Sequence, residues 1–142
     1  MIYVIGIGAD GRGSLSKRAL GVIGRAGLIA GGRRHLDEFP GSGARKVAVS
    51  ADLDGLSGIM ERYIRKCRVR RKRAIIAVLA TGDPLLFGIG DFILKRFGKK
   101  GVEIIPNVST VQEAFARIKE SLNSARVFSV HGKDTDFEGL SR

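Results

Sequence analysis

Cysteine, tryptophan and long apolar runs are scarce in this sequence. Its single cysteine, Cys67, has no partner for an internal disulfide, which favours a reducing, cytoplasmic setting. No apolar run approaches the roughly 18 to 20 residues that cross a bilayer, and we therefore expect no membrane association. The opening residues 1–7 read as a short strand and lack the charged start and the cleavage site of a signal peptide.

Acidic residues are few compared with basic ones. Asp and Glu number 14 and Lys and Arg number 25, which gives a formal net charge of +11. Such a balance predicts attraction to polyanions. Three interpretations stay open here: a nucleic-acid partner, a small molecule with several carboxylates, and a solvated basic surface with no specific partner. The length of 142 residues and the 44% hydrophobic content suit one domain with a sizeable core.

Strand-like apolar runs alternate with helix-like stretches along the chain. The expected strands are residues 2–7, 28–30, 46–49, 74–80, 102–105 and 127–130. The expected helices are one capped by Ser14 that ends near Gly27, one with an apolar face from Leu56 to Ile64, one entered at Pro84 that extends to Phe97, and one capped by Ser109. Repeated β-then-α units predict an α/β fold, a mostly parallel sheet with helices on both faces.

The most distinctive motifs follow the expected strands. In open parallel sheets, ligands bind beyond the carboxyl ends of the strands. The segments that should share this edge are 8–13, 31–34, 81–88, 107–110 and 131–133. We therefore expect a binding site at this edge of the sheet.

The first segment contains a glycine pattern that is also found in dinucleotide-binding folds. Gly6, Gly8 and Gly11 match the spacing GxGxxG after a strand. Those folds place an acidic residue about 20 positions later, where this chain has Arg33 and Arg34. The two arginines could accept the 2′-phosphate of NADP. A glycine turn between strand and helix, without any nucleotide, explains the same residues more simply.

Two further segments combine small and polar residues after strands. Residues 81–88, Thr-Gly-Asp-Pro-Leu-Leu-Phe-Gly, would bring a carboxylate and free backbone N–H groups to the edge, and a capped helix start explains them equally well. In residues 107–110, Asn-Val-Ser-Thr, the hydroxyls could bind a ligand, although helix capping is the simpler explanation. His131 ends the last expected strand, and a lone histidine is more often structural than catalytic. No spacing suits a metal site or a Ser-His-Asp set.

Eight basic residues cluster in residues 62–73, at the end of a helix and in the loop before the 74–80 strand. Cations at a helix C-terminus are favoured by about 0.3 to 1 kcal/mol each at low salt. By topology this run lies at the edge opposite the expected site. A solvated basic face is therefore our leading interpretation of the run.

Taken together, the motifs resemble one known family. Val4–Gly8, Gly31–Leu36, Ala80–Gly90, Ile105–Gln112 and Val130–Lys133 occur in the order and spacing of the tetrapyrrole methylases. The resemblance covers essentially the whole chain. The Gly-Gly-Arg-Arg-His-Leu and His-Gly-Lys segments are most similar to the precorrin-6Y type, which methylates C5 of a cobalt-precorrin.

The resemblance implies that residues 1–142 are the N-terminal α/β domain of an S-adenosylmethionine-dependent C-methyltransferase of cobalamin biosynthesis, with the C-terminal domain largely absent. It implies cofactor contacts at Ala9, Thr81, Gly82, Asp83, Leu86, Ser109 and Thr110. It places the anionic tetrapyrrole, a cobalt-precorrin, against Gly8, Arg33, Arg34 and His131. Methyl transfer from a sulfonium needs no metal and no protein nucleophile, so no catalytic residue is assigned. We also expect a homodimer.

One departure and two alternatives accompany this assignment. Ala9-Asp10 stands where the family often has Pro-Gly, which leaves the conformation of that turn open. A methyltransferase similar to diphthine synthase shares the fold and the Gly-Asp-Pro loop. A basic α/β domain that binds nucleic acid through residues 62–73 is the other alternative, and an aromatic content of only 6% disfavours it because few rings are available for base stacking.

Overall fold

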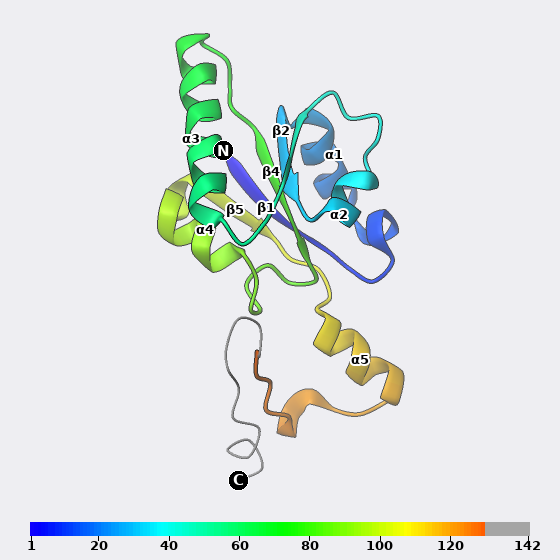
Figure 1. The fold of residues 1–142 in the computed structure, drawn as a ribbon. Helices are drawn as coiled ribbons and strands as arrows, with labels where there is room; N and C mark the ends of the chain where they lie inside the picture. Colours follow the sequence, from blue (N-terminus) through cyan, green and yellow to red (C-terminus); the bar gives the residue numbers. More distant parts are fainter. Residues whose placement is uncertain (130–142) are drawn as a thin grey trace.

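A five-stranded parallel sheet forms the centre of the molecule (Figure 1). The computed structural model describes residues 1–129. The strands are β1 (Ile2–Ile7), β2 (Leu28–Gly31), β3 (Arg45–Ala48), β4 (Ile76–Thr81) and β5 (Val102–Ile105). Their spatial order is β3-β2-β4-β1-β5, and every neighbouring pair is parallel. The expected fold class is confirmed, and the carboxyl ends of these strands meet at one edge.

Helices cover both faces of the sheet, as expected (Figure 1). Helices α1 (Lys17–Arg25) and α2 (Arg33–Asp37) pack on one face, and α3 (Leu53–Val69) and α4 (Gly90–Phe97) pack on the other. Helix α5 (Thr110–Ile118) extends away from the sheet, and three short 3-10 helices are η1 (Gly11–Ser14), η2 (Lys99–Gly101) and η3 (Leu122–Ser124). Within residues 1–129, no helix combines the length and the apolar character that crossing a bilayer requires.

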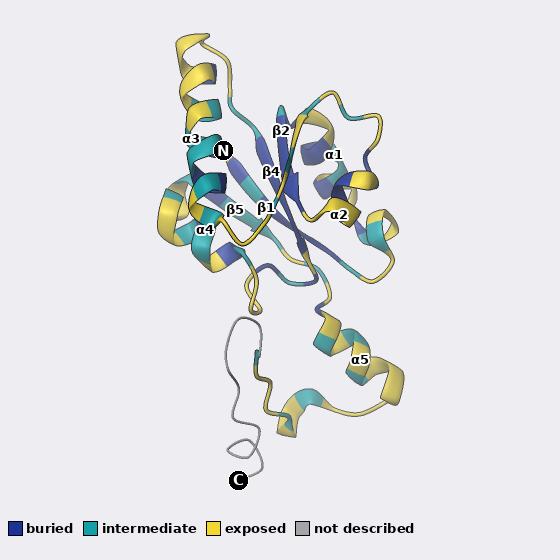
Figure 2. Ribbon diagram, in the orientation of Figure 1, coloured by how far each residue is buried: buried dark blue, intermediate teal, exposed yellow. Residues whose placement is uncertain are grey.

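The central strands are buried because successive side chains enter two different cores (Figure 2). Ile5 and Ile29 belong to the core beneath α1 and α2, whereas Val4 and Leu28 belong to the core beneath α3 and α4. A strand covered on both faces needs apolar side chains at every position. This requirement explains the unbroken apolar run of β4, and the mostly exposed β3 lies at the sheet edge.

Helix α4 begins later than the sequence predicts. We expected Pro84 to open it, but α4 begins at Gly90 and residues 84–89 form a compact turn. The Gly90 N–H donates to the Pro84 carbonyl oxygen at 2.9 Å, and Phe87 has a left-handed φ of +53° that an α-helix does not accommodate. The turn leaves Leu86 and Phe87 exposed beyond the carboxyl end of β4.

Helix α1 also begins after its predicted cap. Its N-cap is Ser16, whose hydroxyl accepts a hydrogen bond from the Ala19 N–H at 3.1 Å. Ser14, the predicted cap, lies in η1 instead. Its hydroxyl accepts from the Gly8 N–H at 2.8 Å and donates to the Gly11 carbonyl oxygen at 2.7 Å. Ser14 therefore closes the glycine turn after β1 rather than capping a helix.

Helix α5 begins at the predicted cap, Ser109, whereas the strand predicted after it is not formed in the described residues. Ser109 is its N-cap, as predicted, and the structure adds a capping box with Gln112. Helix α5 leads the chain away from the sheet, and residues 119–129 lie apart from the sheet (Figure 1). Residues 127–129 are not in a strand, and none of the five described strands pairs with them. The expected strand 127–130 is therefore wrong where the structure describes it, and residues 130–133 lie outside the described part.

Helix α3 ends in a left-handed residue that is not glycine. Arg71 has a φ of +52°. Its N–H donates to the Arg68 carbonyl oxygen at 3.0 Å, and the Lys72 N–H donates to the Cys67 carbonyl oxygen at 2.9 Å. These two bonds form a Schellman cap, which normally carries glycine at the left-handed position.

Replacing this residue with glycine should stabilise the domain. A side chain in the left-handed region costs roughly 1 kcal/mol, so we expect Arg71→Gly to raise the free energy of unfolding by up to about 1 kcal/mol. The matched change Arg68→Gly, inside α3, should lower it by about 1 kcal/mol. Urea unfolding measures both variants, and a loss of stability in Arg71→Gly would contradict the prediction.

Candidate active site

One side chain ties together the loops that follow β1 and β5. The Asn107 Nδ2 atom lies 3.2 Å from the Gly6 carbonyl oxygen and 3.1 Å from the Ser14 carbonyl oxygen. The Asn107 Oδ1 atom accepts a hydrogen bond from the Val108 N–H at 2.8 Å. This amide therefore fixes the loop after β5 against both ends of the glycine turn after β1.

The loop after β4 joins the same edge because glycines let the backbones touch. The Gly82 N–H donates to the Ile7 carbonyl oxygen at 2.6 Å. Gly82 has a φ of +64°, and a Cβ at this position would lie 2.9 Å from the Ser109 Cα. Gly6 faces the Gly82 carbonyl oxygen with no room for a side chain. The predicted convergence of the segments after β1, β4 and β5 is thus confirmed.

The main cavity at this edge has a volume of about 530 Å³. Thr81, Asp83, Leu86, Ser109 and Thr110 line it, which are five of the seven residues expected to contact the cofactor. Its apolar lining includes Leu79, Phe87, Ile89 and Val111. Among the described residues that line the cavity, Asp83 alone carries a formal charge when His35 is neutral. The arrangement suits a partly apolar ligand that bears positive charge.

Asp83 also shapes the loop that carries it. Its Oδ1 atom accepts a hydrogen bond from the Leu85 N–H at 2.8 Å, and the Leu86 N–H donates to the Asp83 carbonyl oxygen at 3.1 Å. These bonds begin the turn at residues 84–89. The expected N–H groups of a helix start do not occur at this place, because α4 begins at Gly90. The loop instead presents the carboxylate of Asp83 and the apolar side chains of Leu86 and Phe87.

The hydroxyl of Ser109 is already engaged within the protein. It accepts a hydrogen bond from the Gln112 N–H at 3.1 Å and lies 2.9 Å from the Gln112 Oε1 atom. The Ser109 residue is also only 3% exposed. Capping therefore accounts for this hydroxyl, and Thr110 is the more available hydroxyl of the pair, since it is exposed.

A second, smaller cavity of about 250 Å³ adjoins the first and shares Thr81, Ser109 and Thr110 with it. The remaining expected cofactor residues, Ala9 and Gly82, line this cavity, as do Gly8 and Arg34 from the expected substrate set. Arg33 lines neither cavity, and its side chain is exposed. His131 lies outside the described residues.

His35 is a residue of the cavity to which the sequence assigned no role. It lies in α2, is 6% exposed, and its Nε2 atom is 3.4 Å from the Thr81 Oγ1 atom. Its Nδ1 atom is buried without a hydrogen-bond partner in the described structure. Burial, and then the positive charge of Arg34, lower the pKa of His35 below its ordinary value of 6.5. Because the residue lines the main cavity, His35 is a candidate for contact with a ligand.

A signal for His35 is present in the sequence but weak. The residue stands beside Leu36, and both are buried against the sheet by the short α2. A single histidine in an apolar position is usually structural, so only the position of α2 beyond the carboxyl end of β2 distinguishes it. Topology, rather than residue type, is what identifies His35.

The dinucleotide interpretation of the glycine pattern fits the structure poorly. In dinucleotide-binding folds the helix opens directly at the glycines. Here η1 (Gly11–Ser14) follows Gly8, and α1 begins only at Lys17. The Gly8 N–H donates its hydrogen bond to the Ser14 hydroxyl, so it is not free to bind a phosphate. The glycines therefore serve close packing of the turn against Asn107 and Ser14.

His35 should make the stability of the domain depend on pH. Because the folded pKa lies below the unfolded value, the unfolded chain binds more protons between the two values, and stability falls as the pH falls below about 6.5. We expect the melting temperature of the wild type to drop more than that of His35→Gln between about pH 7.5 and about pH 5.5. Thermal melts followed by circular dichroism measure this, and parallel pH profiles for the two proteins would contradict it.

Comparison with known proteins identifies the family. The whole chain, residues 1–142, matches the model of the Tetrapyrrole (Corrin/Porphyrin) Methylases. The cobalt-precorrin-7 C(5)-methyltransferase of Salmonella typhimurium is 37% identical over 141 residues, 99% of this chain and 66% of that protein. The crystal structure of precorrin-6Y methylase from Archaeoglobus fulgidus is similar with a TM-score of 0.69 and 33% identity, over 94% of this chain and 66% of that one.

A uroporphyrin-III C-methyltransferase from Thermus thermophilus, solved in complex with S-adenosylhomocysteine, shares the fold with a TM-score of 0.55 and 23% identity, over 80% of this chain and 47% of that one. The chain thus spans just under two thirds of the length of the Salmonella and Archaeoglobus proteins. Sequence match, sheet topology and the clustered loops agree. The chain belongs to the tetrapyrrole methylase family.

Proposed function

We propose that the protein of which this domain is part transfers a methyl group from S-adenosylmethionine to C5 of a cobalt-precorrin in cobalamin biosynthesis. The observation that carries the proposal is the main cavity, where Asp83 is the sole acid amid apolar side chains. The names of the Salmonella and Archaeoglobus relatives support the substrate, since both are precorrin methylases. No observation favours the diphthine synthase alternative independently.

The residues of the cavity fit the cofactor in charge, shape and polarity. S-adenosylmethionine supplies an activated methyl group on a positively charged sulfonium. Asp83 would complement that charge, since opposite charges attract strongly where water is partly excluded. Leu86 and the other apolar lining residues would cover the adenosine, and Thr81 and Thr110 offer hydroxyls for its polar groups. Ala9 and Gly82 would contact the cofactor through the smaller cavity.

The chemical contribution of this domain is positioning. Its loops are held by the Asn107 amide and the Gly82 contact independently of any ligand. Holding two reactants at the correct distance and angle can supply about 7 to 11 kcal/mol of the barrier reduction. A rigid edge suits this task, because it loses little conformational freedom when a ligand binds. His35 would hold the Thr81 hydroxyl at the wall of the main cavity.

The tetrapyrrole would lie beside the cofactor rather than in the same cavity. A precorrin carries many carboxylates, and the acidic main cavity disfavours them. Arg34 and Gly8 line the adjacent cavity, and a guanidinium can clamp a carboxylate with two parallel hydrogen bonds. We include Arg33 and His131 in the substrate set on the resemblance alone. Ala9 and Gly82 of the cofactor set and the carboxylate of Glu113 line this cavity too, so the cofactor and the substrate would meet there.

A second domain would complete this cleft. None of the α5 residues is buried, although Val111, Phe115 and Ile118 share one helix face and Ile118 is 64% exposed. Val108, just before α5, is 51% exposed. Figure 2 shows this helix as exposed or half-buried along its length. We propose that the C-terminal domain of the full protein covers this face. A homodimer and a cytoplasmic location are part of the same proposal.

The charge of Asp83 should contribute to cofactor affinity. In Asp83→Asn the side chain can still accept the Leu85 N–H bond, so the loop should keep its shape while the charge is lost. We expect the affinity of the complete protein for S-adenosylmethionine to fall about ten-fold, by analogy with other partly desolvated charge pairs. Calorimetry measures the change. Asp91→Asn, on the exposed face of α4, is the matched control, and equal losses in the two variants would contradict the role of Asp83.

Arg34 should affect the substrate rather than the cofactor. We expect Arg34→Gln to raise the KM for the cobalt-precorrin about ten-fold, since a charge-assisted bidentate contact is lost, while cofactor affinity stays unchanged. Arg25→Gln, at the exposed end of α1, removes the same charge outside the cavities and should alter neither quantity. A labelled-methyl assay gives the KM, and an equal effect of both variants would show that Arg34 acts only through the net charge.

A further inference from the structure

Another hollow, lined mainly by basic side chains, lies at the end of the sheet opposite the candidate active site. It has a volume of about 480 Å³ and is bordered by the starts of β2 and β3, the last turns of α3 and the loop before β4. Five cationic side chains line it: Arg45, Arg62, Lys66, Arg70 and Lys72. We call it the basic pocket. The edge of the sheet expected to bind the cofactor lies at the other end of β4, roughly 17 Å along the strand.

Within residues 1–129, the cations of the basic pocket have no acidic partner. No Asp or Glu lines the pocket. The ion pairs between described residues engage Arg18, Lys95, Arg96 and Arg117, none of which belongs to it. Convergence of like charges around a hollow is unfavourable unless an anion enters it. All five residues are exposed, and they come from three separate segments that border one space.

The frame of the basic pocket is fixed by backbone hydrogen bonds. The Arg45 N–H donates to the Gly27 carbonyl oxygen at 3.0 Å, and the Gly27 N–H donates to the Ile75 carbonyl oxygen at 3.1 Å. The Schellman cap of α3 turns Lys72 back toward the helix through its bond to Cys67 at 2.9 Å. Segments 27–45, 62–70 and 72–75 are therefore held together before any ligand is present.

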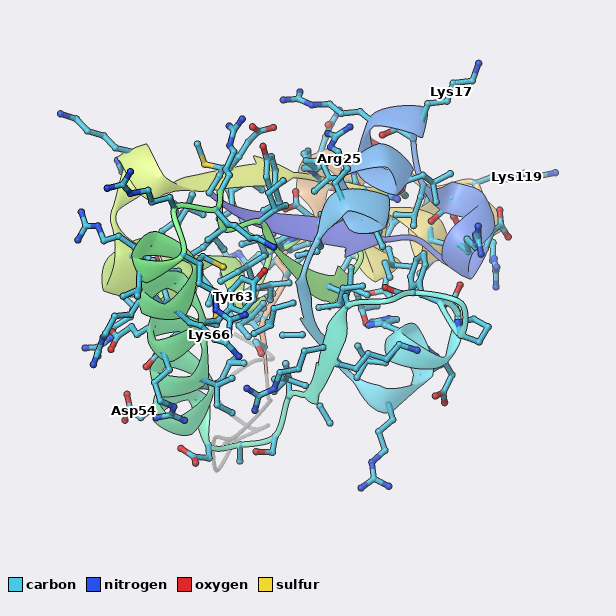
Figure 3. All side chains as sticks on the ribbon, turned by 90° about the horizontal axis from the view of Figure 1, so that it is seen from above. Lys17, Arg25, Asp54, Tyr63, Lys66 and Lys119 are labelled. Carbon is cyan, nitrogen blue, oxygen red and sulfur yellow. The ribbon has the colours of Figure 1, made fainter. Side chains whose placement is uncertain are left out.

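Tyr63 adds a neutral donor to this frame. Its hydroxyl packs against Gly27, where a Cβ would have no room. Burial and a hydrogen bond with Cys67 raise the pKa of Tyr63 to about 12, so the phenol stays protonated at neutral pH. Figure 3 shows Tyr63 and Lys66 on the side of α3 that faces the strands, where Tyr63 is half-buried and Lys66 is exposed. A hydroxyl and several cations thus face one hollow.

We propose that the basic pocket binds a compact polyanion, a small molecule that carries several phosphate or carboxylate groups. The size of the hollow suits a small molecule held on several sides, and lysine, arginine and phenol donors are the groups that recognise such oxygens. This ligand is separate from the methyl acceptor, because the two sites lie at opposite ends of the sheet. The proposal does not depend on the proposed methyl transfer.

Titration calorimetry on the complete protein tests the proposal, with tripolyphosphate and citrate as the two probes. We expect at least one probe to bind, and Lys66→Gln/Lys72→Gln to weaken it about ten-fold or more, because two charge-assisted contacts are lost. The control Lys17→Gln/Lys119→Gln removes the same charge from the far side of the molecule, as Figure 3 shows, and should change the affinity less than about two-fold, since distant exposed charges are screened by salt.

The outcomes separate the possible ligands. Tripolyphosphate binding that depends on Lys66 and Lys72 identifies a phosphate ligand, and the same dependence for citrate identifies a carboxylate ligand. Equal weakening in both double variants would overturn the proposal, because the attraction would then come from net charge alone. Failure of both probes to bind, with or without binding of a single-stranded RNA oligonucleotide, would overturn it as well. Circular dichroism spectra that match the wild type verify that the variants are folded.

Discussion

The contact of the Asn107 amide with the Gly6 and Ser14 carbonyl oxygens is the interaction on which the candidate site depends. It joins segments that are 101 and 93 residues apart in the sequence. The Gly82 N–H bond to Ile7 adds the third loop. A partly buried amide without partners would cost about 1 to 3 kcal/mol, so this arrangement favours one conformation of the edge. The cavity is consequently shaped before a ligand arrives.

The cavity lined by Asp83 and the hollow lined by basic residues lie at opposite ends of the sheet. The main cavity is lined by one acid, Asp83, and the adjacent cavity by both Arg34 and Glu113. Most of the basic run at residues 62–73 lies at the other end of the strands, as sequence topology predicts. The net charge of +11 therefore has no single explanation. Part of it faces the expected anionic substrate, and part surrounds a separate hollow at the start of β2 and β3.

Sequence patterns predict the sheet well and the loops poorly. Buried strands need apolar side chains at successive positions, so β1, β2 and β4 can be predicted from their apolar runs. The path of residues 84–89 is not, because a left-handed φ at Phe87 and the Gly90–Pro84 hydrogen bond replace the helix that Asp-Pro suggests. Ser14 looks like a cap, and only its distant partners show that it closes a turn. Only the position of α2 after β2 identifies His35 as a cavity residue, since nothing in the local sequence distinguishes it from a structural histidine.

Hydrogen–deuterium exchange with and without S-adenosylhomocysteine is the most direct test of the central claim, that the cofactor binds where the loops after β4 and β5 meet. The account predicts slower exchange in residues 79–90 and 107–112 of the complete protein, with no change in residues 62–73. Protection confined to residues 62–73, or absent from both loops at saturating ligand, would contradict it.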